Sequence, residues 1–340
     1  MAEAILTATD LVKYYPIRGG VMRRTVGHVK AVDGVSFVVN KGETLGIVGE
    51  SGCGKSVTAL SVLRLIPEPG KIVGGHIFFK DRDVTRMSAE ELREFRGNDV
   101  AMIFQDPMTS LNPVLRVGFQ IKEAMIAHER FDNHAAEERV VPMLQKVRIP
   151  APKDRAKNYP HQFSGGMRQR AMIAMGLSNE PGLLIADEPT TALDVTVQAQ
   201  IIELLRDLNR EMGTAVVLIT HNLAVVASLC TRVIVMYAGR IVEQGPTRQI
   251  FYNPQHPYTW SLLQSIPRID STQHDKLLTI SGLPPDLSNP PPGCLFHPRC
   301  RFRVDRCSQE EPPLEEVGPG QDARCWVLMK NALAGAESTS

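Results

Sequence analysis

One short motif constrains the fold of this chain more than any other feature: residues 49–56 read GESGCGKS. The motif fits the pattern G-x-x-x-x-G-K-[ST], follows an apolar run at residues 44–48 and precedes a helical pattern at residues 57–66. In this setting glycines let backbone N–H groups surround phosphate oxygens, and the helix N-terminus adds its positive dipole. The motif therefore predicts a phosphate-binding loop in which Lys55 reaches the β- and γ-phosphates of a nucleotide and Ser56 binds Mg²⁺.

Apolar runs of strand length recur along the chain, at residues 183–186 and 215–219, and each is stopped by polar side chains. Between them, apolar residues repeat at three- and four-residue steps up to Met212, and Gly213 is a suitable helix stop. Short apolar strands that alternate with helices are typical of an α/β fold with a parallel sheet covered on both faces. In such a sheet, functional residues belong at the carboxyl ends of the strands.

The length of 340 residues favours about two domains. Residues 120–148 have a helical pattern, within a helical subdomain that we place at about 106–178, and residues 18–30 are Gly-rich and basic, which predicts a loop. The patterns at residues 233–237 and 241–244 predict a β-hairpin. Residues 77–79 indicate a strand in a separate antiparallel β segment near the N-terminus. Prolines become frequent after residue 253. We therefore expect a nucleotide-binding domain at residues 1–250 and a C-terminal extension at residues 251–340.

The charge balance excludes some classes of protein. The net charge is +1, from 38 Lys and Arg against 37 Asp and Glu, which gives no support to general nucleic-acid binding or to an electrostatic membrane anchor. No apolar run approaches the ~18 residues that a membrane-spanning helix needs. The first ten residues carry acids and lack the apolar segment of a secretory signal, so the expected compartment is the cytosol.

Polar side chains that follow the predicted strands are candidates for chemistry on a nucleotide. Asp187 and Glu188 come directly after four apolar residues, where Asp187 would bind Mg²⁺ and Glu188 would polarise the attacking water. His221 closes the third strand and is placed to donate to a γ-phosphate oxygen, and Gln105 is a candidate for touching Mg²⁺ or the water. Each of these residues alone would more simply be a strand end or a turn, and only the neighbouring phosphate loop favours a catalytic role.

A second anion cradle is predicted at residues 164–170, which read SGGMRQR and lead into a helix at 170–177. A serine, two glycines and a helix N-terminus form such a cradle. Because one ATP needs only one phosphate loop, we interpret the second cradle as one that holds the γ-phosphate of an ATP bound by another subunit.

Taken together, these motifs resemble those of the ATP-binding subunits of ABC transporters. The six motifs occur in the family's order: the phosphate loop at 49–56, Gln105, the signature at 164–167, the acidic strand at 183–188, the D-loop at 191–194, and His221. The resemblance implies a P-loop ATPase fold with a parallel-sheet core, an antiparallel β subdomain and a helical subdomain, and head-to-tail dimerisation around two ATP molecules. It implies an ATP site formed by Tyr15, which stacks on adenine, and by Gly49, Ser51, Gly52, Cys53, Gly54, Lys55, Ser56 and Val57. It also implies Mg²⁺ ligation by Ser56, Gln105 and Asp187 and a coupling role for Asp194.

Two positions depart from the family's commonest pattern. The signature's first three residues, Ser164, Gly165 and Gly166, are followed by Met167 where the family most often has Gln, so the usual amide contact is lacking. Asn222 stands where an Asp commonly follows the switch histidine.

Three further stretches resemble the dipeptide and oligopeptide importer branch of the family: residues 102–113, 256–259 and 292–300. This resemblance implies import of peptides at the cytoplasmic face of a bacterial inner membrane. The implied partners are a second related ATPase in a heterodimer, two membrane permeases and an extracytoplasmic binding protein, with no nucleic acid. Dipeptides, longer peptides, haem and nickel stay open as substrates.

Four of the six cysteines fall near the C-terminus: Cys294, Cys300, Cys307 and Cys325. Their spacing lacks the tight C-x₂₋₄-C pairs of structural zinc sites, whereas a Cys₄ iron–sulfur cluster tolerates wider spacing. Free thiols in a loop are the simplest alternative. The resemblance to peptide-importer ATPases favours a structural [4Fe–4S] cluster, with zinc as the weaker alternative.

A rival interpretation is a soluble ABC ATPase that acts on nucleic acid or ribosomes, with the cysteines as a zinc module. Such proteins commonly carry two ATPase cores or a long coiled coil. This sequence shows neither, and its near-neutral charge also disfavours that class.

Overall fold

The computed structural model describes residues 3–19, 24–128, 131–191, 193–266 and 280–337. Its chain is organised as two compact units, each assembled from separate stretches of sequence. The first unit comprises Met1–Thr7, Val38–Thr44 and Phe78–Thr220. The second unit comprises Ala8–Phe37, Leu45–Ile77 and His221–Ser340.

The first unit contains three parallel strands, with β7 (Leu183–Asp187) between β6 (Val100–Ile103) and β8 (Ala215–Ile219). Every residue of β7 and β8 is buried, which explains why these segments are almost wholly apolar. The register pairs Asp187 with Ile219, so the acid closes the buried strand at its carboxyl end. The predicted strands at 183–186 and 215–219 are thereby confirmed.

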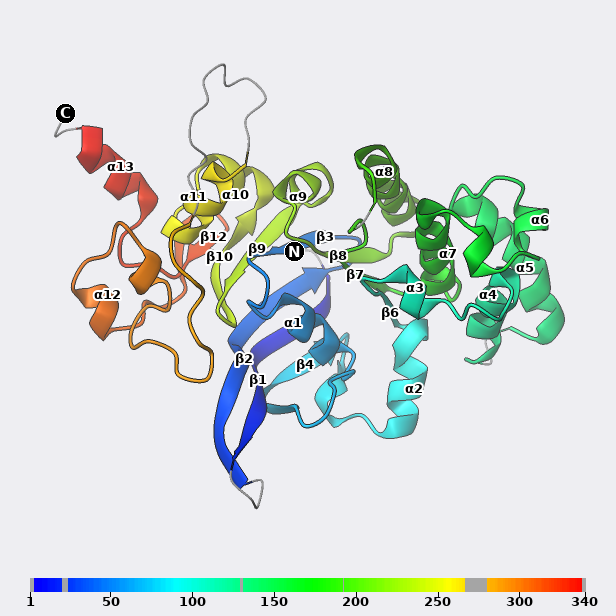
Figure 1. Cartoon of the computed structure of the whole chain (residues 1–340), viewed down its shortest axis with the longest axis horizontal. Coiled ribbons are helices and arrows are strands. Elements are labelled where there is room, and N and C mark those ends of the chain that lie inside the picture. Colours follow the sequence, from blue (N-terminus) through cyan, green and yellow to red (C-terminus); the bar gives the residue numbers. More distant parts are fainter. Residues whose placement is uncertain (1–2, 20–23, 129–130, 192, 267–279, 338–340) are drawn as a thin grey trace. The chain divides into compact units, whose positions relative to one another are not determined.

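Helices make up most of the rest of the first unit, and α4, α5, α6 and α7 pack together (Figure 1). The longest, α8, is amphipathic and ends where Gly213 adopts a φ of 67°, as its pattern predicts. The helices, the 3₁₀ turns and the strand β5 of this unit differ widely in length. Their bounds are β5 Arg82–Asp83, a 3₁₀ turn at Val84–Arg86, α2 Ala89–Asn98, α3 Pro107–Ser110, α4 Val117–Ile126, α5 Asn133–Lys146, α6 Pro152–Arg155, a 3₁₀ turn at Pro160–Gln162, α7 Gly165–Leu177 and α8 Val195–Met212.

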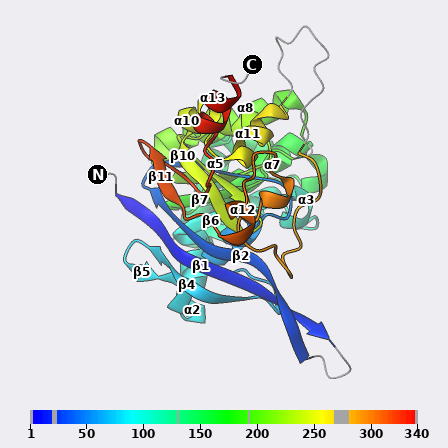
Figure 2. The same cartoon turned by 90° about the vertical axis from the view of Figure 1, so that its left-hand side faces the viewer.

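The second unit holds most of a long two-stranded ribbon, in which β1 (Ala4–Gly19) and β2 (Arg24–Asn40) run side by side (Figures 1 and 2). The strand β4 (Lys71–Phe79) lies beside β1. In the same unit, β3 (Thr44–Val48) pairs in parallel with β9 (Arg232–Tyr237). The antiparallel partner of β9 is β10 (Arg240–Pro246), which confirms the predicted hairpin.

The helices of the second unit include α1, which follows the phosphate loop, and several in the C-terminal part of the chain. Their bounds are α1 Lys55–Val62, α9 Leu223–Leu229, α10 Thr247–Tyr252, α11 Pro257–Gln264, a 3₁₀ turn at His297–Arg299, α12 Arg306–Gln309 and α13 Met329–Glu337. The helix α1 is shorter than the predicted 57–66 but lies where the phosphate-loop motif requires a helix.

The expected loop at residues 18–30 is wrong, because β1 continues to Gly19 and β2 begins at Arg24; residues 20–23 lie outside the described residues. The first residues of β2, from Arg24 to Val26, are exposed. Polar, basic composition here reflects a solvated ribbon rather than the absence of strands.

The structure does not show the expected small cysteine-rich domain as a body of its own. The strand β12 (Gln321–Ala323) pairs with β10, and β11 (Glu315–Gly318) pairs with β12. The extension therefore continues the sheet of the second unit. Two strands of three and four residues carry too few side chains for sequence periodicity to reveal them.

Candidate functional site

The phosphate loop between β3 and α1 is shaped by glycines that no other residue could replace without strain. Gly49 and Gly54 have φ values of 148° and 104°. A Cβ atom at Gly49 would lie 2.2 Å from the carbonyl oxygen of Met236, and one at Gly54 would lie 2.4 Å from that of Ala31. The fixed glycines of the motif are thus explained by the close approach of neighbouring backbone.

Lys55, the first residue of α1, points back across this loop. Its buried Nζ donates to the carbonyl oxygens of Gly49, at 2.8 Å, and Glu50, at 2.9 Å. Cys53 is also buried, and burial raises the pKa of its thiol. Ser51 and Gly52 are exposed at the tip of the loop. The loop therefore holds an ammonium and a helix N-terminus beneath an accessible tip, which suits an anion.

Two further predicted residues of the ATP site belong to the same unit. Tyr15 is partly buried on β1, and burial raises the pKa of its hydroxyl. His221 is exposed directly before α9, whose N-cap is Asn222. Asn222 Oδ1 accepts hydrogen bonds from the N–H groups of Ala224, at 3.0 Å, and Val225, at 3.4 Å. Because Asn and Asp cap helices equally well, Asn222 fulfils this local role of the commoner Asp.

In the first unit, Glu188 and Gln105 come together, as a shared role in catalysis requires. Glu188 Oε2 accepts a hydrogen bond from Gln105 Nε2 at 3.1 Å. Glu188 has a φ of 47°, and its N–H donates to the carbonyl oxygen of Ile219 at 2.8 Å. A non-glycine residue in this strained region is a recurring feature of functional sites. Asp187, one residue earlier, is buried at the end of β7.

The structure adds Thr191 to this group. Its Oγ1 donates to Glu188 Oε2 at 2.9 Å, so one carboxylate oxygen accepts from both Gln105 and Thr191. The predicted D-loop includes Thr191, but the motif alone assigns it no contact with Glu188. The three-residue spacing from Glu188 across a turn was the signal available for this contact, since Thr191 N–H also donates to the Glu188 carbonyl at 3.2 Å.

The signature segment forms the start of α7. Ser164 is its N-cap, and Ser164 Oγ accepts from the N–H of Met167 at 3.3 Å. A Cβ atom at Gly166 would lie 2.6 Å from Val197 Cγ1, whereas one at Gly165 would lie 3.4 Å from Leu193 Cδ2. Ser164 and Gly165 are exposed. Asp194, the predicted coupling residue, caps α8 by accepting from the N–H of Val197 at 2.9 Å.

The structure thus gathers the predicted residues into two sets. The second unit contains Tyr15, His221 and the phosphate loop, and the first unit contains Gln105, Asp187, Glu188, the signature and Asp194. Each set has the local geometry described above. Ala192 of the D-loop lies outside the described residues.

The four C-terminal cysteines do not form a metal site in this structure. Among the described residues, no three side chains of His, Cys, Asp or Glu are arranged to hold a metal ion. Burial raises the pKa of Cys300 to about 11 and that of Cys325 to about 12, and nearby thiols add to both effects. Cys325 Sγ lies 3.0 Å from the carbonyl oxygen of Val327, to which it donates. The expected [4Fe–4S] cluster is therefore not supported by the described residues, and the Cys325 thiol bonds to the backbone of Val327 instead.

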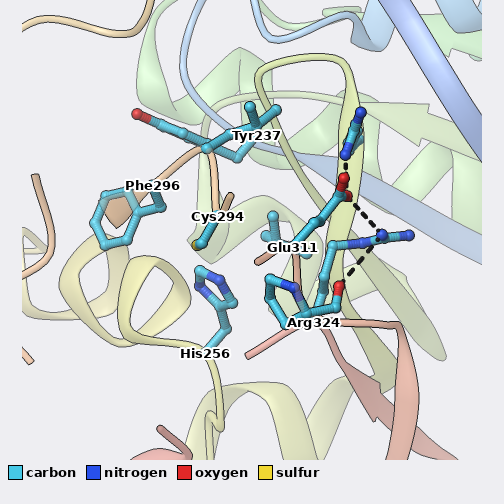
Figure 3. A pocket seen from close by; sticks show the side chains of 10 residues that line it. Tyr237, His256, Cys294, Phe296, Glu311 and Arg324 are labelled. Carbon is cyan, nitrogen blue, oxygen red and sulfur yellow. Dashed lines mark hydrogen bonds and ion pairs between the residues drawn. The ribbon is translucent and has the colours of Figure 1, made fainter. Parts of the chain in front are cut away.

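Cys294 lines a small cavity in the second unit, together with Tyr237, His256, Phe296, Glu311 and Arg324 (Figure 3). Glu311 accepts a hydrogen bond from Arg324, at 2.8 Å, and is also paired with Arg240. His256 caps α11, since its Nδ1 accepts from the N–H of Tyr258 at 3.0 Å, and burial lowers the pKa of His256 to about 3. The pair of Glu311 and Arg240 connects the extension to β10.

No helix within the described part of the chain is both long enough and apolar enough to span a bilayer.

Family models match two parts of the chain. The model described as ABC transporter matches residues 32–191, and the model described as oligopeptide/dipeptide transporter, C-terminal region, matches residues 242–307. A probable peptide ABC transporter ATP-binding protein of Sinorhizobium fredii is 53% identical over 326 residues, covering 96% of this chain and 95% of its own. The oligopeptide transport ATP-binding protein OppD of Bacillus subtilis is 50% identical over 307 residues, covering 90% of this chain and 86% of its own.

Solved structures agree with this assignment. The ATP-binding cassette MJ0796, a dimer in a post-hydrolysis state bound to ADP and Pi, has a TM-score of 0.62 and 26% identity, covering 72% of this chain and 99% of its own. CbiO1 of Clostridium perfringens, part of a transporter complex, has a TM-score of 0.61 and 26% identity, covering 74% of this chain and 92% of its own. The chain therefore belongs to the ABC transporter ATPases, in the branch of the ATP-binding subunits of oligopeptide and dipeptide transporters.

Proposed function

We propose that this ABC ATPase hydrolyses ATP to drive the import of dipeptides or oligopeptides through a membrane transporter. The observation that supports this proposal best is the joining of a complete phosphate loop to an extension of the oligopeptide/dipeptide transporter type. Relatives about half identical to this chain carry names of peptide-transport ATP-binding proteins.

In the proposed ATP site, the phosphate loop holds the nucleotide while Tyr15 stacks on its adenine. Lys55 then transfers its contacts from the loop carbonyls to the β- and γ-phosphates. Ser56, Gln105 and Asp187 supply a hydroxyl, an amide and a carboxylate, the oxygen donors that Mg²⁺ prefers. Bound Mg²⁺ would neutralise charge on the phosphate oxygens during transfer.

Glu188 is the proposed general base for the attacking water. Gln105 and Thr191 both donate to its Oε2, and these two hydrogen bonds would orient the carboxylate for accepting the proton. His221 would donate to the γ-phosphate and so distinguish ATP from ADP.

The exposed cradle at Ser164–Met167 supports the proposed head-to-tail dimer with a second, related ATPase subunit. ATP would close the dimer, and hydrolysis would reopen it and drive two permeases fed by an extracytoplasmic peptide-binding protein. These contacts would put the subunit at the cytoplasmic face of the cell membrane. In this arrangement residues 1–250 form the nucleotide-binding domain, and residues 251–340 form the extension.

The four C-terminal cysteines support a separate and more specific proposal, an iron–sulfur cluster. Cys294, Cys300 and Cys307 lie near enough to Cys325 to add to the rise in its pKa that burial causes, and the four thiols would hold a [4Fe–4S] cluster if Cys325 left the Val327 backbone. Anaerobic purification followed by iron, sulfide and zinc analysis tests this. Stoichiometric zinc or no metal would contradict it.

The transport proposal is tested by reconstituting this chain with its permeases in proteoliposomes and measuring uptake of labelled di- and tripeptides. Uptake should require ATP and disappear with Glu188→Gln, whereas Glu180→Gln, at an exposed carboxylate paired with Arg139, should behave as wild type. Uptake that proceeds without ATP, or no uptake of any peptide, would contradict the proposal.

A further inference from the structure

Glu50, the second residue of the phosphate loop, is tied to the C-terminal extension rather than left at the surface. Its N–H donates to Tyr258 Oη at 2.8 Å. Its carboxylate accepts two parallel hydrogen bonds from Arg299, with Nη1 2.6 Å from Oε2 and Nη2 3.0 Å from Oε1. The same residue's carbonyl accepts from Lys55 Nζ at 2.9 Å. Glu50 therefore links the extension to the lysine that is to bind phosphate.

Arg299 is built into this position. Its side chain is only 5% exposed, against 27% for Glu50. Its remaining donors are also used, since Nη1 reaches Tyr237 Oη at 3.3 Å, Nε reaches the carbonyl of Ser281 at 3.1 Å and Nη2 reaches that of Ile280 at 3.4 Å. A partly buried bidentate pair of this kind fixes geometry more strictly than a single contact does.

The aromatic side chains around Arg299 hold it still. Phe296 packs edge-on against Tyr237, with ring centroids 5.2 Å apart, and against Tyr258, with centroids 5.3 Å apart. The ring centroids of Tyr237 and Tyr258 are 4.6 Å apart. Tyr258 and Phe296 are almost completely buried. The extension thus presents Arg299 and Tyr258 to the loop from a rigid base.

We propose that Arg299 is a positioning residue of the ATP site: through Glu50 it holds the phosphate loop in the conformation that receives nucleotide, so that the C-terminal extension sets ATP affinity. This inference rests on the proposed role of the loop in ATP binding. It goes beyond that role because Arg299 lies 249 residues away from Glu50 in the sequence and acts on the loop only through that residue's carboxylate.

Direct measurement of ATP affinity in the full-length chain tests the proposal. TNP-ATP fluorescence, with displacement by Mg·ATP, gives the Kd for wild type, Arg299→Gln, Arg299→Lys and Glu50→Gln. Arg299→Gln should weaken binding about tenfold or more, because charge-assisted hydrogen bonds to a partly buried carboxylate are lost. Arg299→Lys keeps the charge but not the two parallel hydrogen bonds, so its Kd should lie between those of wild type and Arg299→Gln. The double variant Glu50→Gln/Arg299→Gln should be no weaker than the worse single one.

A local readout separates positioning from general stability. Cys53 is buried in the loop, so loosening the loop should speed its alkylation, measured by peptide mapping, at temperatures well below the unfolding midpoint. The matched control is Arg306→Gln, since Arg306 pairs with Glu310 on an exposed part of the same extension. It should change neither the Kd nor the alkylation of Cys53.

The outcomes distinguish the proposed function from the positioning role of Arg299. Wild-type chain that fails to bind TNP-ATP or ATP would contradict the proposed function itself. Wild-type chain that binds, with Arg299→Gln folded and within twofold of its affinity, would overturn the positioning role. If Arg299→Gln fails to fold, Glu50→Gln removes the same ion pair from the loop side, and unchanged affinity there would also overturn it.

Discussion

The chain contains two segments suited to binding phosphate, and they are built in opposite ways. The phosphate loop is enclosed, and its Lys55 and Cys53 are buried. At two of its glycines, an added Cβ atom would lie 2.2 and 2.4 Å from backbone carbonyl oxygens. The signature segment is an exposed helix start whose Gly165 has ordinary contact distances around it. The two glycines of the loop meet surrounding backbone, whereas the signature begins at its own serine cap and its Gly166 meets a side chain, that of Val197.

Under the proposed dimer, this difference would explain how one chain can hold ATP and still need a partner. An enclosed loop is already organised for an anion, so the loss of entropy on binding is small. An exposed helix N-terminus offers a weaker attraction, which salt and water screen. In the proposed dimer, the signature would therefore become effective when another subunit brings a nucleotide to it. Mutations should accordingly separate binding, which depends on the loop, from turnover, which depends on the catalytic residues and the signature as well.

The largest effect should come from Glu188→Gln, which removes the proposed base and leaves both phosphate-binding segments intact. Turnover should fall about 10²- to 10⁴-fold, the range that general base catalysis contributes. The Kd for ATP should stay near the wild-type value, because the amide that replaces the carboxylate keeps a side-chain oxygen that accepts from Gln105 and Thr191. Phosphate release and equilibrium binding measure the two quantities. Hydrolysis at the wild-type rate would refute the assignment of the base.

Glycine replacements test the comparison directly. Gly54→Ala should weaken ATP binding by about tenfold to a hundredfold, since a Cβ there meets the Ala31 carbonyl at 2.4 Å and the residue has a φ of 104°. The matched change Gly165→Ala, in the signature, has no such conflict and should leave the affinity of the isolated chain unchanged. Equal losses of affinity in the two variants would break the distinction between the segments.

Much of this arrangement could be predicted from sequence, where local patterns carry the information. The loop motif, the buried strands before Asp187 and His221, and the helix that ends at Gly213 all depend on residues close in sequence. The link from Arg299 to Glu50 could not be predicted this way, because the two residues are 249 positions apart and neither belongs to a periodic pattern. The pairing of β12 with β10 could not be predicted for the same reason, because the two strands are far apart in the sequence.

The features of the candidate site also separate into those that local sequence predicts and those that depend on contacts in space. Glu188 and Asp187 follow from a strand that ends in acids, and Ser164 follows from a helix start. The contact of Gln105 with Glu188 and the role of Thr191 depend on how a turn and a neighbouring strand end meet in space. Cysteine spacing predicted a common site, but it could not show that Cys325 bonds to the backbone of Val327.

The unit that encloses the phosphate loop also buries a charge at a cost in stability. Lys13 is fully buried over the ring of Tyr15, its Nζ has no hydrogen-bond partner among the described residues, and burial lowers its pKa to about 8. The unfolded chain, with a pKa of 10.5 for this lysine, binds more protons between pH 8 and 10.5. Stability should therefore rise with pH across that window, and the full penalty should be present below pH 8.

Lys13→Met tests this cost. It should raise the free energy of unfolding by about 2 kcal/mol at pH 7, and the gain should shrink as the pH approaches 10.5. Urea unfolding at a series of pH values measures both. Lys122→Met, at a lysine that forms a salt bridge to Glu137, is the control and should show no such gain at pH 7. A pH-independent difference for Lys13→Met would mean that packing, and not charge burial, is responsible.

The smallest effect is expected at the signature, where Ser164→Ala removes a helix cap. Losing the bond from Met167 N–H to Ser164 Oγ should lower the free energy of unfolding by about 1 kcal/mol. Affinity for ATP in the isolated chain should not change, because the signature is proposed to contact the ATP of the partner subunit and not the chain's own nucleotide. Turnover of the assembled transporter should nevertheless fall, since the serine is then missing from the ATP of the partner subunit. Ser178→Ala, at the other end of α7, provides the control, because its Oγ donates to the Met175 carbonyl at 2.7 Å and the residue is not part of the proposed signature. Lower stability without lower turnover in the assembled complex would show that the signature is merely a capped helix, and the contrast between the two segments would no longer describe function.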